Sequence, residues 1–207
     1  MSGELTKAIA ELEENEALRL TREKLDSGED PQLILEESRK GMEIIGKRFS
    51  DGTYFLPELI YSAEILKEIT EIVKPKLKGE EQTKRLGKCI IGTVAGDIHD
   101  IGKDIVVFML DVNGFEVYDL GVDVPPQTFV EKIKETGAPI VGLSGFLTLA
   151  FDSMKETVDA IKAAGLRDKV NIMIGGGQMD EEIRKYAGAD AYGLDAMAAV
   201  SLAKTWL

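Results

Sequence analysis

The sequence predicts an α + α/β chain, in which an N-terminal four-helix bundle is followed by a flavodoxin-like, doubly wound sheet of five parallel strands. Three observations predict this class. Residues 1–77 carry apolar side chains at helical spacing, residues 88–207 alternate short apolar runs with helical stretches, and the segment 78–87 between them is polar.

The first two helices are predicted from the spacing of their apolar residues, which recur at steps of three and four. These residues are Leu5, Ile9 and Leu12 in the first helix and Leu18, Thr21 and Leu25 in the second, with a break near Glu14-Asn15. Gly28 is expected to end the second helix, because glycine readily adopts the left-handed conformation that follows a helix C-terminus.

The third and fourth helices have clear starts. Asp30 before Pro31 supplies the residue types preferred at a helix N-cap and at the first helical position. The fourth helix opens at Leu56-Pro57 and ends near Lys74. The expected buried face of the third helix consists of Leu35, Ser38, Met42, Ile45 and Phe49. Short connections between four helices with apolar stripes predict an antiparallel bundle.

The segment 78–87 reads KGEEQTKRLG, which is polar and has glycine near both margins. Such a composition is typical of a linker. The predicted organisation is therefore a helical domain at 1–77, a linker at 78–87 and a second domain at 88–207.

The second domain alternates strands and helices. Strands are predicted at 89–94, 115–120, 140–144, 170–174 and 191–193, and helices from about 103 and at 128–136, 151–164, 180–186 and 195–206. Nearly continuous apolar runs indicate a parallel sheet covered on both faces. Ligands of such folds bind beyond the carboxyl ends of the strands, so the loops 95–102, 145–148 and 175–177 are expected to carry the chemistry.

The composition excludes several classes of function. The 207 residues carry 25 basic and 37 acidic side chains, a net charge of −12, which disfavours nucleic acid and anionic membranes as partners. One cysteine excludes an intrachain disulfide, and one histidine plus one cysteine are too few for a structural zinc site, which needs about four ligands. Cys89 lies in the first predicted strand and is interpreted as a core residue.

No targeting segment is apparent. The N-terminus is charged from Glu4 onward, unlike a secretory signal, and no stretch approaches the roughly 18 apolar residues of a transmembrane helix. A cytoplasmic location is expected.

The single histidine lies in the loop AGDIHDIGK, residues 95–103, after the first strand. A lone loop histidine is usually a hydrogen-bonded surface group, but this loop occupies the switch point of the predicted sheet. Asp97 is placed to accept a hydrogen bond from one imidazole nitrogen of His99 and leave the other as a metal ligand. One histidine does not hold a bare metal ion tightly, but it supplies one axial bond to a metal that a macrocycle already holds.

These residues resemble a known pattern. Asp97-x-His99-x-x-Gly102, then 41 residues, Ser144-x-Phe146, 28 residues and Gly175-Gly176 resembles the cobalamin-binding motif of corrinoid proteins in multi-component methyltransferase systems. The segment FSDGTYFLP, residues 49–57, resembles the helical cap of cobalamin-dependent methionine synthase and of those proteins. The resemblance covers nearly the whole chain.

The resemblance implies a role for each matching residue. His99 would be the lower axial ligand of the cobalt in a base-off, His-on cobalamin or related corrinoid, such as methylcobalamin, and Asp97 would orient it. Phe49 and Leu56 would cover the upper face of the corrin. The other implied cofactor-binding residues are Asp100, Ile101, Gly102, Ser144, Phe146, Thr148, Gly175 and Gly176.

Two positions depart from the family pattern. Phe146 stands where leucine is usual, which places a larger ring beside the slot for the nucleotide tail of the cofactor. Ala150 stands where methionine synthase has the serine of a His-Asp-Ser relay, so His99 and Asp97 are expected to form a dyad open to water.

The function implied by the resemblance is that of a non-catalytic corrinoid subunit. It would shuttle a methyl group between a donor-specific methyltransferase and a second methyltransferase acting on tetrahydrofolate or coenzyme M, with a reductive activase as a further partner. The alternatives are a cobalamin-binding sensor or storage module, the small subunit of an adenosylcobalamin mutase, and a nucleotide- or flavin-binding module.

Overall fold

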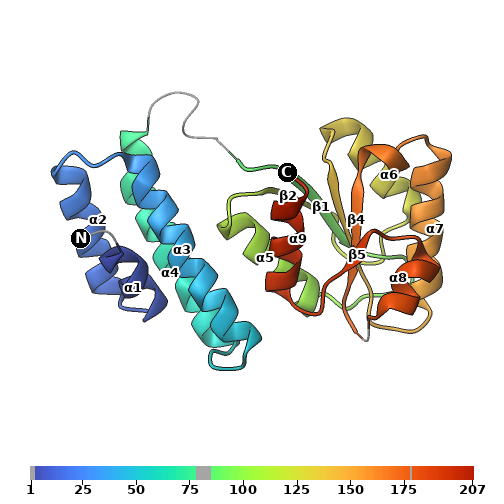
Figure 1. Cartoon of the computed structure of the whole chain (residues 1–207), viewed down its shortest axis with the longest axis horizontal. Coiled ribbons are helices and arrows are strands. Elements are labelled where there is room, and N and C mark those ends of the chain that lie inside the picture. Colours follow the sequence, from blue (N-terminus) through green and yellow to red (C-terminus); the bar gives the residue numbers. More distant parts are fainter. Residues whose placement is uncertain (1–2, 78–84, 178) are drawn as a thin grey trace. The chain divides into compact units, whose positions relative to one another are not determined.

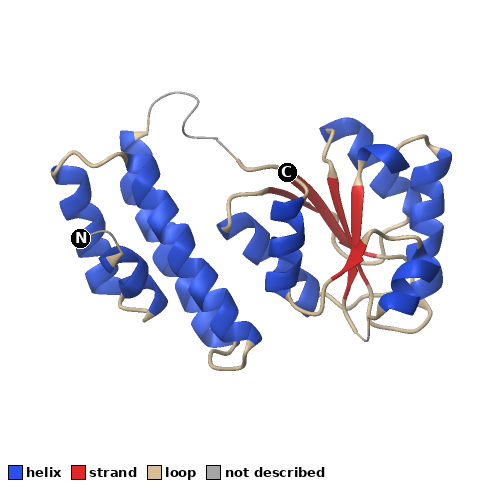
Figure 2. Ribbon diagram, in the orientation of Figure 1, coloured by secondary structure: helices blue, strands red, loops and turns tan. Residues whose placement is uncertain are grey.

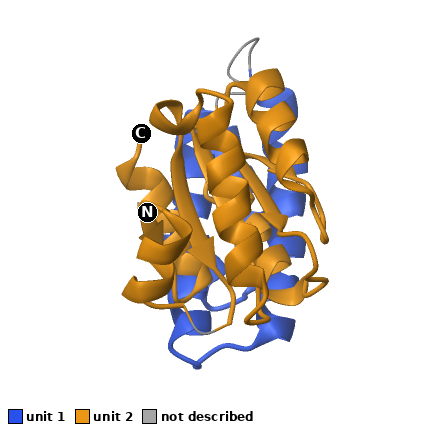
Figure 3. Ribbon diagram, turned by 90° about the vertical axis from the view of Figure 1, so that its right-hand side faces the viewer, with its two compact units in different colours: residues 1–84 blue, residues 85–207 orange. Residues whose placement is uncertain are grey.

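The computed structural model describes residues 3–77, 85–177 and 179–207. The chain divides into two compact units, Met1–Lys84 and Arg85–Leu207, which Figure 3 shows in different colours. Most of the linker predicted at 78–87 lies outside the described residues.

The first unit consists of helices (Figure 1). They are α1 (Glu4–Ala10), α2 (Glu14–Asp26), α3 (Pro31–Ser50) and α4 (Leu56–Val73), followed by a 3₁₀ turn at Lys74–Lys76. Helix α3 packs against both α1 and α4, and α2 packs against α1 and α4. The Asp30 carboxylate accepts a hydrogen bond from the amide of Gln32, so Asp30 is the N-cap of α3, as predicted.

Two details of this unit differ from the prediction. Helix α1 ends at Ala10, and Leu12 has a left-handed backbone with φ of 59°, so Leu12 does not continue the first helix. On α3, Ile34 is completely buried whereas Leu35 is half-buried. Of the other predicted core positions, Ser38, Met42 and Ile45 are buried and Phe49 is half-buried.

The second unit contains a five-stranded parallel sheet in the order β2-β1-β3-β4-β5 (Figure 2). Its strands are β1 (Lys88–Thr93), β2 (Glu116–Asp119), β3 (Ile140–Ser144), β4 (Asn171–Gly175) and β5 (Ala191–Tyr192). This is the flavodoxin-like strand order, which confirms the predicted fold class.

Helices cover both faces of the sheet. They are α5 (Ile101–Val112), α6 (Pro126–Thr136), α7 (Ala150–Ala163), α8 (Glu181–Ala187) and α9 (Ala196–Thr205). Helices α5 and α9 pack together on one face, and α6, α7 and α8 lie on the other (Figure 1). The core beneath the second group includes Phe129, Val141, Leu143, Ile172 and Ile174. Four of these residues, Val141, Leu143, Ile172 and Ile174, come from strands. Because helices cover the other face as well, the strand runs read as continuously hydrophobic.

Cys89 is completely buried in β1, and burial raises the pKa of its thiol to about 12. Its interpretation as a core residue is confirmed. Among the described residues, no helix is long and apolar enough to cross a membrane.

Candidate functional site

The site lies in the loop between β1 and α5, which two neighbouring segments hold in place. The amide of Gly96 donates to Oδ1 of Asp123 at 2.7 Å, and the amide of Asp123 donates to the carbonyl of Asp97 at 2.9 Å. The buried Thr93 hydroxyl donates to the carbonyl of His99 at 2.9 Å. The strand end and the loop after β2 therefore fix the backbone on both sides of the histidine.

Asp97 and His99 form the centre of the site. Nδ1 of His99 lies 2.6 Å from Oδ1 of Asp97, and the amide of His99 donates to the same oxygen at 3.0 Å. The Asp97 side chain is completely buried, whereas the His99 side chain is 51% exposed. An ionised carboxylate only accepts hydrogen bonds, so Nδ1 carries the proton and Nε2 keeps a free lone pair. The pair thus presents one ring nitrogen as a ligand.

The second oxygen of Asp97 is held by the loop after β3. Oδ2 accepts hydrogen bonds from the amides of Phe146 at 2.6 Å and of Leu147 at 2.9 Å. The expectation that Ala150 leaves the dyad open to water is wrong for the aspartate, because Asp97 is completely buried and its second oxygen is occupied by these two backbone amides.

The charge state of Asp97 follows from these contacts. Burial alone would raise the pKa of the carboxyl, but the amides of Leu147, His99 and Phe146 and the His99 ring all donate to the charged form. These hydrogen bonds outweigh burial and hold the pKa of Asp97 well below its usual range. Asp97 is therefore ionised at neutral pH, as orientation of His99 requires.

A buried lysine anchors the start of α5 beside the predicted Gly102. Nζ of Lys103 lies 2.6 Å from carboxylate oxygens of both Asp104 and Asp119. Burial would lower the pKa of Lys103, but the two carboxylates outweigh it and raise the pKa. This ion-pair cluster ties α5 to the end of β2.

Exposed apolar side chains surround this edge of the sheet. They come from the loops or helix starts that follow β1, β2, β3 and β5, and they are Ile98, Ile101, Val122, Phe146, Leu147, Leu149 and Leu194. The sequence reasoning named Ile101 and Phe146 and missed the rest. Their signal was present as apolar residues in the segments that follow strands, at the edge where ligands of this fold bind.

The predicted glycines serve different purposes. An added Cβ on Gly102 would meet nothing within 4 Å, and one on Gly175 would meet only the Gly193 carbonyl, at 3.7 Å. Gly176 has φ of 110°, and a Cβ there would lie 2.3 Å from the Gly145 carbonyl oxygen. Gly176 is thus required by the loop's own packing, whereas Gly102 and Gly175 leave open space.

Ser144 and Gly175 lie side by side, because β3 and β4 pair at this register, and Thr93 of β1 pairs with Ser144. The next residue, Gly145, faces α7: a Cβ there would contact Ala150 and Met154. Since side chains alternate along a strand, Ser144 faces the side covered by α5 and α9. Small residues and a hydroxyl on this face are suited to a slot for a nucleotide tail.

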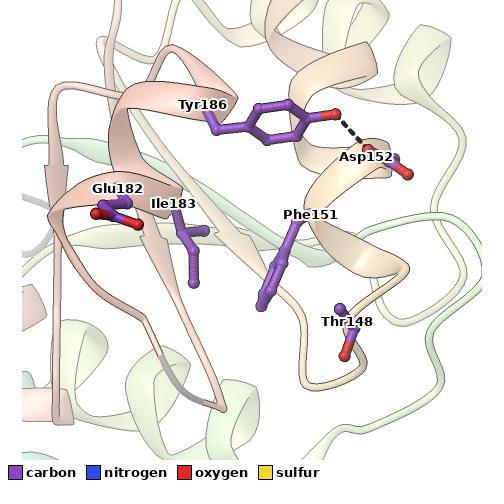
Figure 4. Close-up of a pocket in the computed structure, with 6 residues that line it drawn as sticks. All are labelled: Thr148, Phe151, Asp152, Glu182, Ile183 and Tyr186. Atoms are coloured by element: carbon purple, nitrogen blue, oxygen red, sulfur yellow. Dashed lines mark hydrogen bonds between the residues drawn. The ribbon is translucent and has the colours of Figure 1, made fainter.

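Thr148 is not brought together with Ser144. It lines an open pocket with residues of α7 and α8, as Figure 4 shows. The other lining residues are Phe151, Asp152, Glu182, Ile183 and Tyr186, and the Tyr186 hydroxyl donates to Asp152 at 2.5 Å. The pocket lies on the face opposite to Ser144, so the two predicted hydroxyls belong to different surroundings.

The remaining predicted residues have simple positions. Asp100 is exposed and directly precedes α5. Phe49 is half-buried near the end of α3, and Leu56 is exposed at the start of α4, where it follows the more exposed Phe55. Phe49 and Leu56 belong to the helical unit, and their role over a corrin stays a prediction.

The residues of the second unit fit a corrinoid. A free Nε2 on a half-exposed, oriented imidazole is suited to an axial bond, apolar side chains surround it, and open space lies at Gly102 and Gly175. Among the described residues, no group of three or more His, Cys, Asp or Glu side chains is placed to hold a metal ion.

Comparisons with known proteins agree with this geometry. Two family models, each described as a B12 binding domain, match residues 2–74 and 87–201. The chain is 41% identical over 202 residues to trimethylamine corrinoid protein 2 of Methanosarcina mazei, covering 97% of this chain and 93% of that protein.

Two solved structures are similar over nearly the whole chain. A cobalamin-binding protein from Desulfitobacterium hafniense DCB-2 has a TM-score of 0.86 and 39% identity, covering 100% of this chain and 98% of that chain. A chain of the methanol:cobalamin methyltransferase complex from Methanosarcina barkeri has a TM-score of 0.81 and 27% identity, covering 98% of this chain and 77% of that chain. With both B12 binding domains matched and full-length relatives of this kind, the chain belongs to the B12-binding family of corrinoid proteins.

Proposed function

We propose that this protein is a methyl carrier of a methylamine-dependent methyltransferase system and holds its corrinoid through Nε2 of His99. The observation that carries this proposal is the His99–Asp97 pair, in which a buried carboxylate fixes the imidazole with Nε2 free at an apolar edge. A surface histidine without a ligand would need neither the buried aspartate nor the apolar surroundings.

The residues of the chain divide the work of holding the cofactor. When bound, the corrinoid supplies a cobalt centre that accepts and releases a methyl group. His99 would hold the cobalt through Nε2 while Asp97 keeps the proton on Nδ1, and Ile98, Ile101 and Leu149 would exclude water from the bound cofactor. Ser144, Gly102 and Gly175 would accommodate the nucleotide tail, and the prediction for the helical unit stays that Phe49 and Leu56 would cover the corrin.

The proposed partners are enzymes that this chain does not itself contain. A donor-specific methyltransferase loads the methyl group, and a second methyltransferase passes it to tetrahydrofolate or coenzyme M. A reductive activase restores the cofactor after oxidation. The similarity to a trimethylamine corrinoid protein over 97% of this chain favours a methylamine as the donor. The proposed location, with these partners, is the cytoplasm.

The direct test is a methyl-transfer assay with defined donors. The purified chain is loaded with cobalamin and mixed with trimethylamine, dimethylamine, monomethylamine or methanol methyltransferases and their substrates. We expect transfer from one of the methylamines, read by the visible spectrum and by the mass of the extracted cofactor. Tight cobalamin binding without transfer from any donor would contradict the carrier role and favour storage or sensing.

A further inference from the structure

Phe146 contacts both members of the His99–Asp97 pair. Its backbone amide donates to Oδ2 of Asp97 at 2.6 Å, and its ring lies against the His99 imidazole with ring centroids 4.7 Å apart and planes tilted by 35°. No other described residue combines a hydrogen bond to this aspartate with a ring contact to this histidine.

The Phe146 side chain contacts His99 although it is largely exposed to solvent. Phe146 is 58% exposed, so its ring is only partly buried in the core of the unit. The separation from the imidazole lies at the short end of the range in which aromatic pairs attract each other. The His99 imidazole is the aromatic ring that this exposed side chain contacts.

The geometry also explains why the histidine needs a second restraint. The imidazole is attached to the chain at Cγ and hydrogen-bonded to Asp97 at Nδ1, so the motion left to this half-exposed ring is a tilting pivot of its plane about the line through those two atoms. A ring packed against its face limits that pivot. The direction of the Nε2 lone pair then depends on both contacts.

We propose that Phe146 is a positioning residue for His99: its amide fixes the carboxylate that orients the imidazole, and its ring fixes the plane in which Nε2 points toward the cofactor. This rests on the proposed role of His99 as axial ligand. Leucine, the residue usual at this position of the motif, would keep the amide contact and lose the ring contact.

The test begins with the cofactor-free protein, because a chain with one histidine gives one unambiguous set of imidazole NMR signals. The full chain, labelled at histidine, is compared with Phe146→Leu. We expect wild-type protein to show cross-peaks between the His99 and Phe146 ring protons. In Phe146→Leu the His99 ring signals should lose their ring-current shift, and Phe146→Tyr should retain it.

Leu194→Ala is the matched control, because Leu194 is exposed at the same edge and has no ring. Its His99 signals should stay at the wild-type positions. The amide spectrum of each variant reports whether it is folded. Identical His99 ring signals in wild type and Phe146→Leu would overturn the proposal, whatever the protein binds.

The second arm uses cobalamin-loaded protein. We expect Phe146→Leu to lower the ratio of His-on to His-off cobalamin by about 2- to 12-fold, the effect of losing one aromatic pair, with Phe146→Tyr near wild type. The readouts are the visible spectrum and the nitrogen splitting in the electron paramagnetic resonance spectrum of the Co(II) form. An unchanged ratio would overturn the positioning role, whereas failure of every variant including wild type to show nitrogen splitting would instead overturn His99 as the ligand.

Discussion

His99 and Asp97 lie 2.6 Å apart through Nδ1 and Oδ1, and the aspartate is completely buried. The carboxylate has further donors in the amides of Phe146 and Leu147, so its charge is satisfied by the protein itself. The imidazole is therefore oriented before any ligand arrives, which lowers the entropic cost of forming an axial bond.

We expect Asp97→Asn to weaken both the fold and the axial bond. The amide oxygen of asparagine would face the two amides of the β3 loop, which leaves the NH₂ group facing His99. The backbone amide of His99 then has no acceptor. Because the NH₂ group can only donate, Nδ1 becomes an acceptor and the imidazole proton moves to Nε2. The free energy of unfolding should fall by about 1–3 kcal/mol in urea denaturation of cofactor-free protein.

Asp168→Asn is the control for this substitution, because Asp168 is exposed in the 3₁₀ turn Arg167–Lys169. It should leave the free energy of unfolding within about 0.5 kcal/mol of wild type. A stable Asp97→Asn variant with a wild-type cobalamin spectrum would contradict the role assigned to the carboxylate.

The lowered pKa of Asp97 should make the free energy of unfolding depend on pH. Its pKa is depressed in the folded state, so its contribution to stability is present above the unfolded pKa of about 3.9 and is lost as pH falls toward the folded pKa. The difference in free energy of unfolding between wild type and Asp97→Asn should therefore shrink as pH is lowered from about 5 to 3. Denaturation series at fixed ionic strength measure it, and a constant difference would show that the pKa of Asp97 is the same in the folded and unfolded states.

Much of the fold was predictable from the sequence because its signals are local. The strand at 140–144 was predicted with its observed bounds, and the loops after β1, β3 and β4 lie at the edge where the strand order reverses. Apolar runs separated by glycine-bearing loops directly indicate these strands and the loops that follow them. The histidine loop was found for the same reason, since its residues are close in sequence.

The contacts that complete the site were not predictable in this way. Asp97 bonds to amides 49 and 50 residues further along the chain, and no periodicity reports such a contact. The end of α1 has a similar cause: the Ala10 carbonyl accepts from Arg48 and from the Tyr54 hydroxyl, so a tertiary contact stops the helix before Leu12. Spacing alone extended that helix to Leu12.

His99→Ala should change cobalamin binding while leaving the stability of the fold nearly unchanged. The ring is half-exposed, and Asp97 keeps three backbone amides in its absence, so the free energy of unfolding should change by no more than about 1 kcal/mol. The visible spectrum of bound cobalamin should change to a form without a protein nitrogen ligand. An unchanged spectrum would remove His99 from the cobalt.

Cys89 gives a direct test of the buried sheet. It is the only cysteine, it is completely buried, and its thiol pKa is raised to about 12. A thiol reagent at pH 8 should therefore leave the native protein unmodified and label one site fully in urea, because the thiolate is the reactive form. Rapid labelling of native protein would mean that β1 is accessible.

The two glycines Gly102 and Gly176 should respond in opposite ways to alanine. Gly102 lies in the first turn of α5 with open space around it, so Gly102→Ala should leave the free energy of unfolding unchanged or raise it by up to about 1 kcal/mol. Gly176→Ala places a Cβ 2.3 Å from the Gly145 carbonyl oxygen at a left-handed backbone, and should lower it by about 1–3 kcal/mol or more.

Cobalamin affinity tests whether the open space beside Gly102 receives the cofactor. If the space beside Gly102 receives the cofactor, Gly102→Ala should bind cobalamin more weakly although the cofactor-free protein is at least as stable as wild type. Isothermal titration with cobalamin, beside urea denaturation of the same preparation, measures both quantities. Unchanged cobalamin affinity in Gly102→Ala would place the cofactor away from the start of α5. The added methyl group contacts nothing in the cofactor-free protein, so it can weaken binding only by contacting a ligand that enters the space beside it.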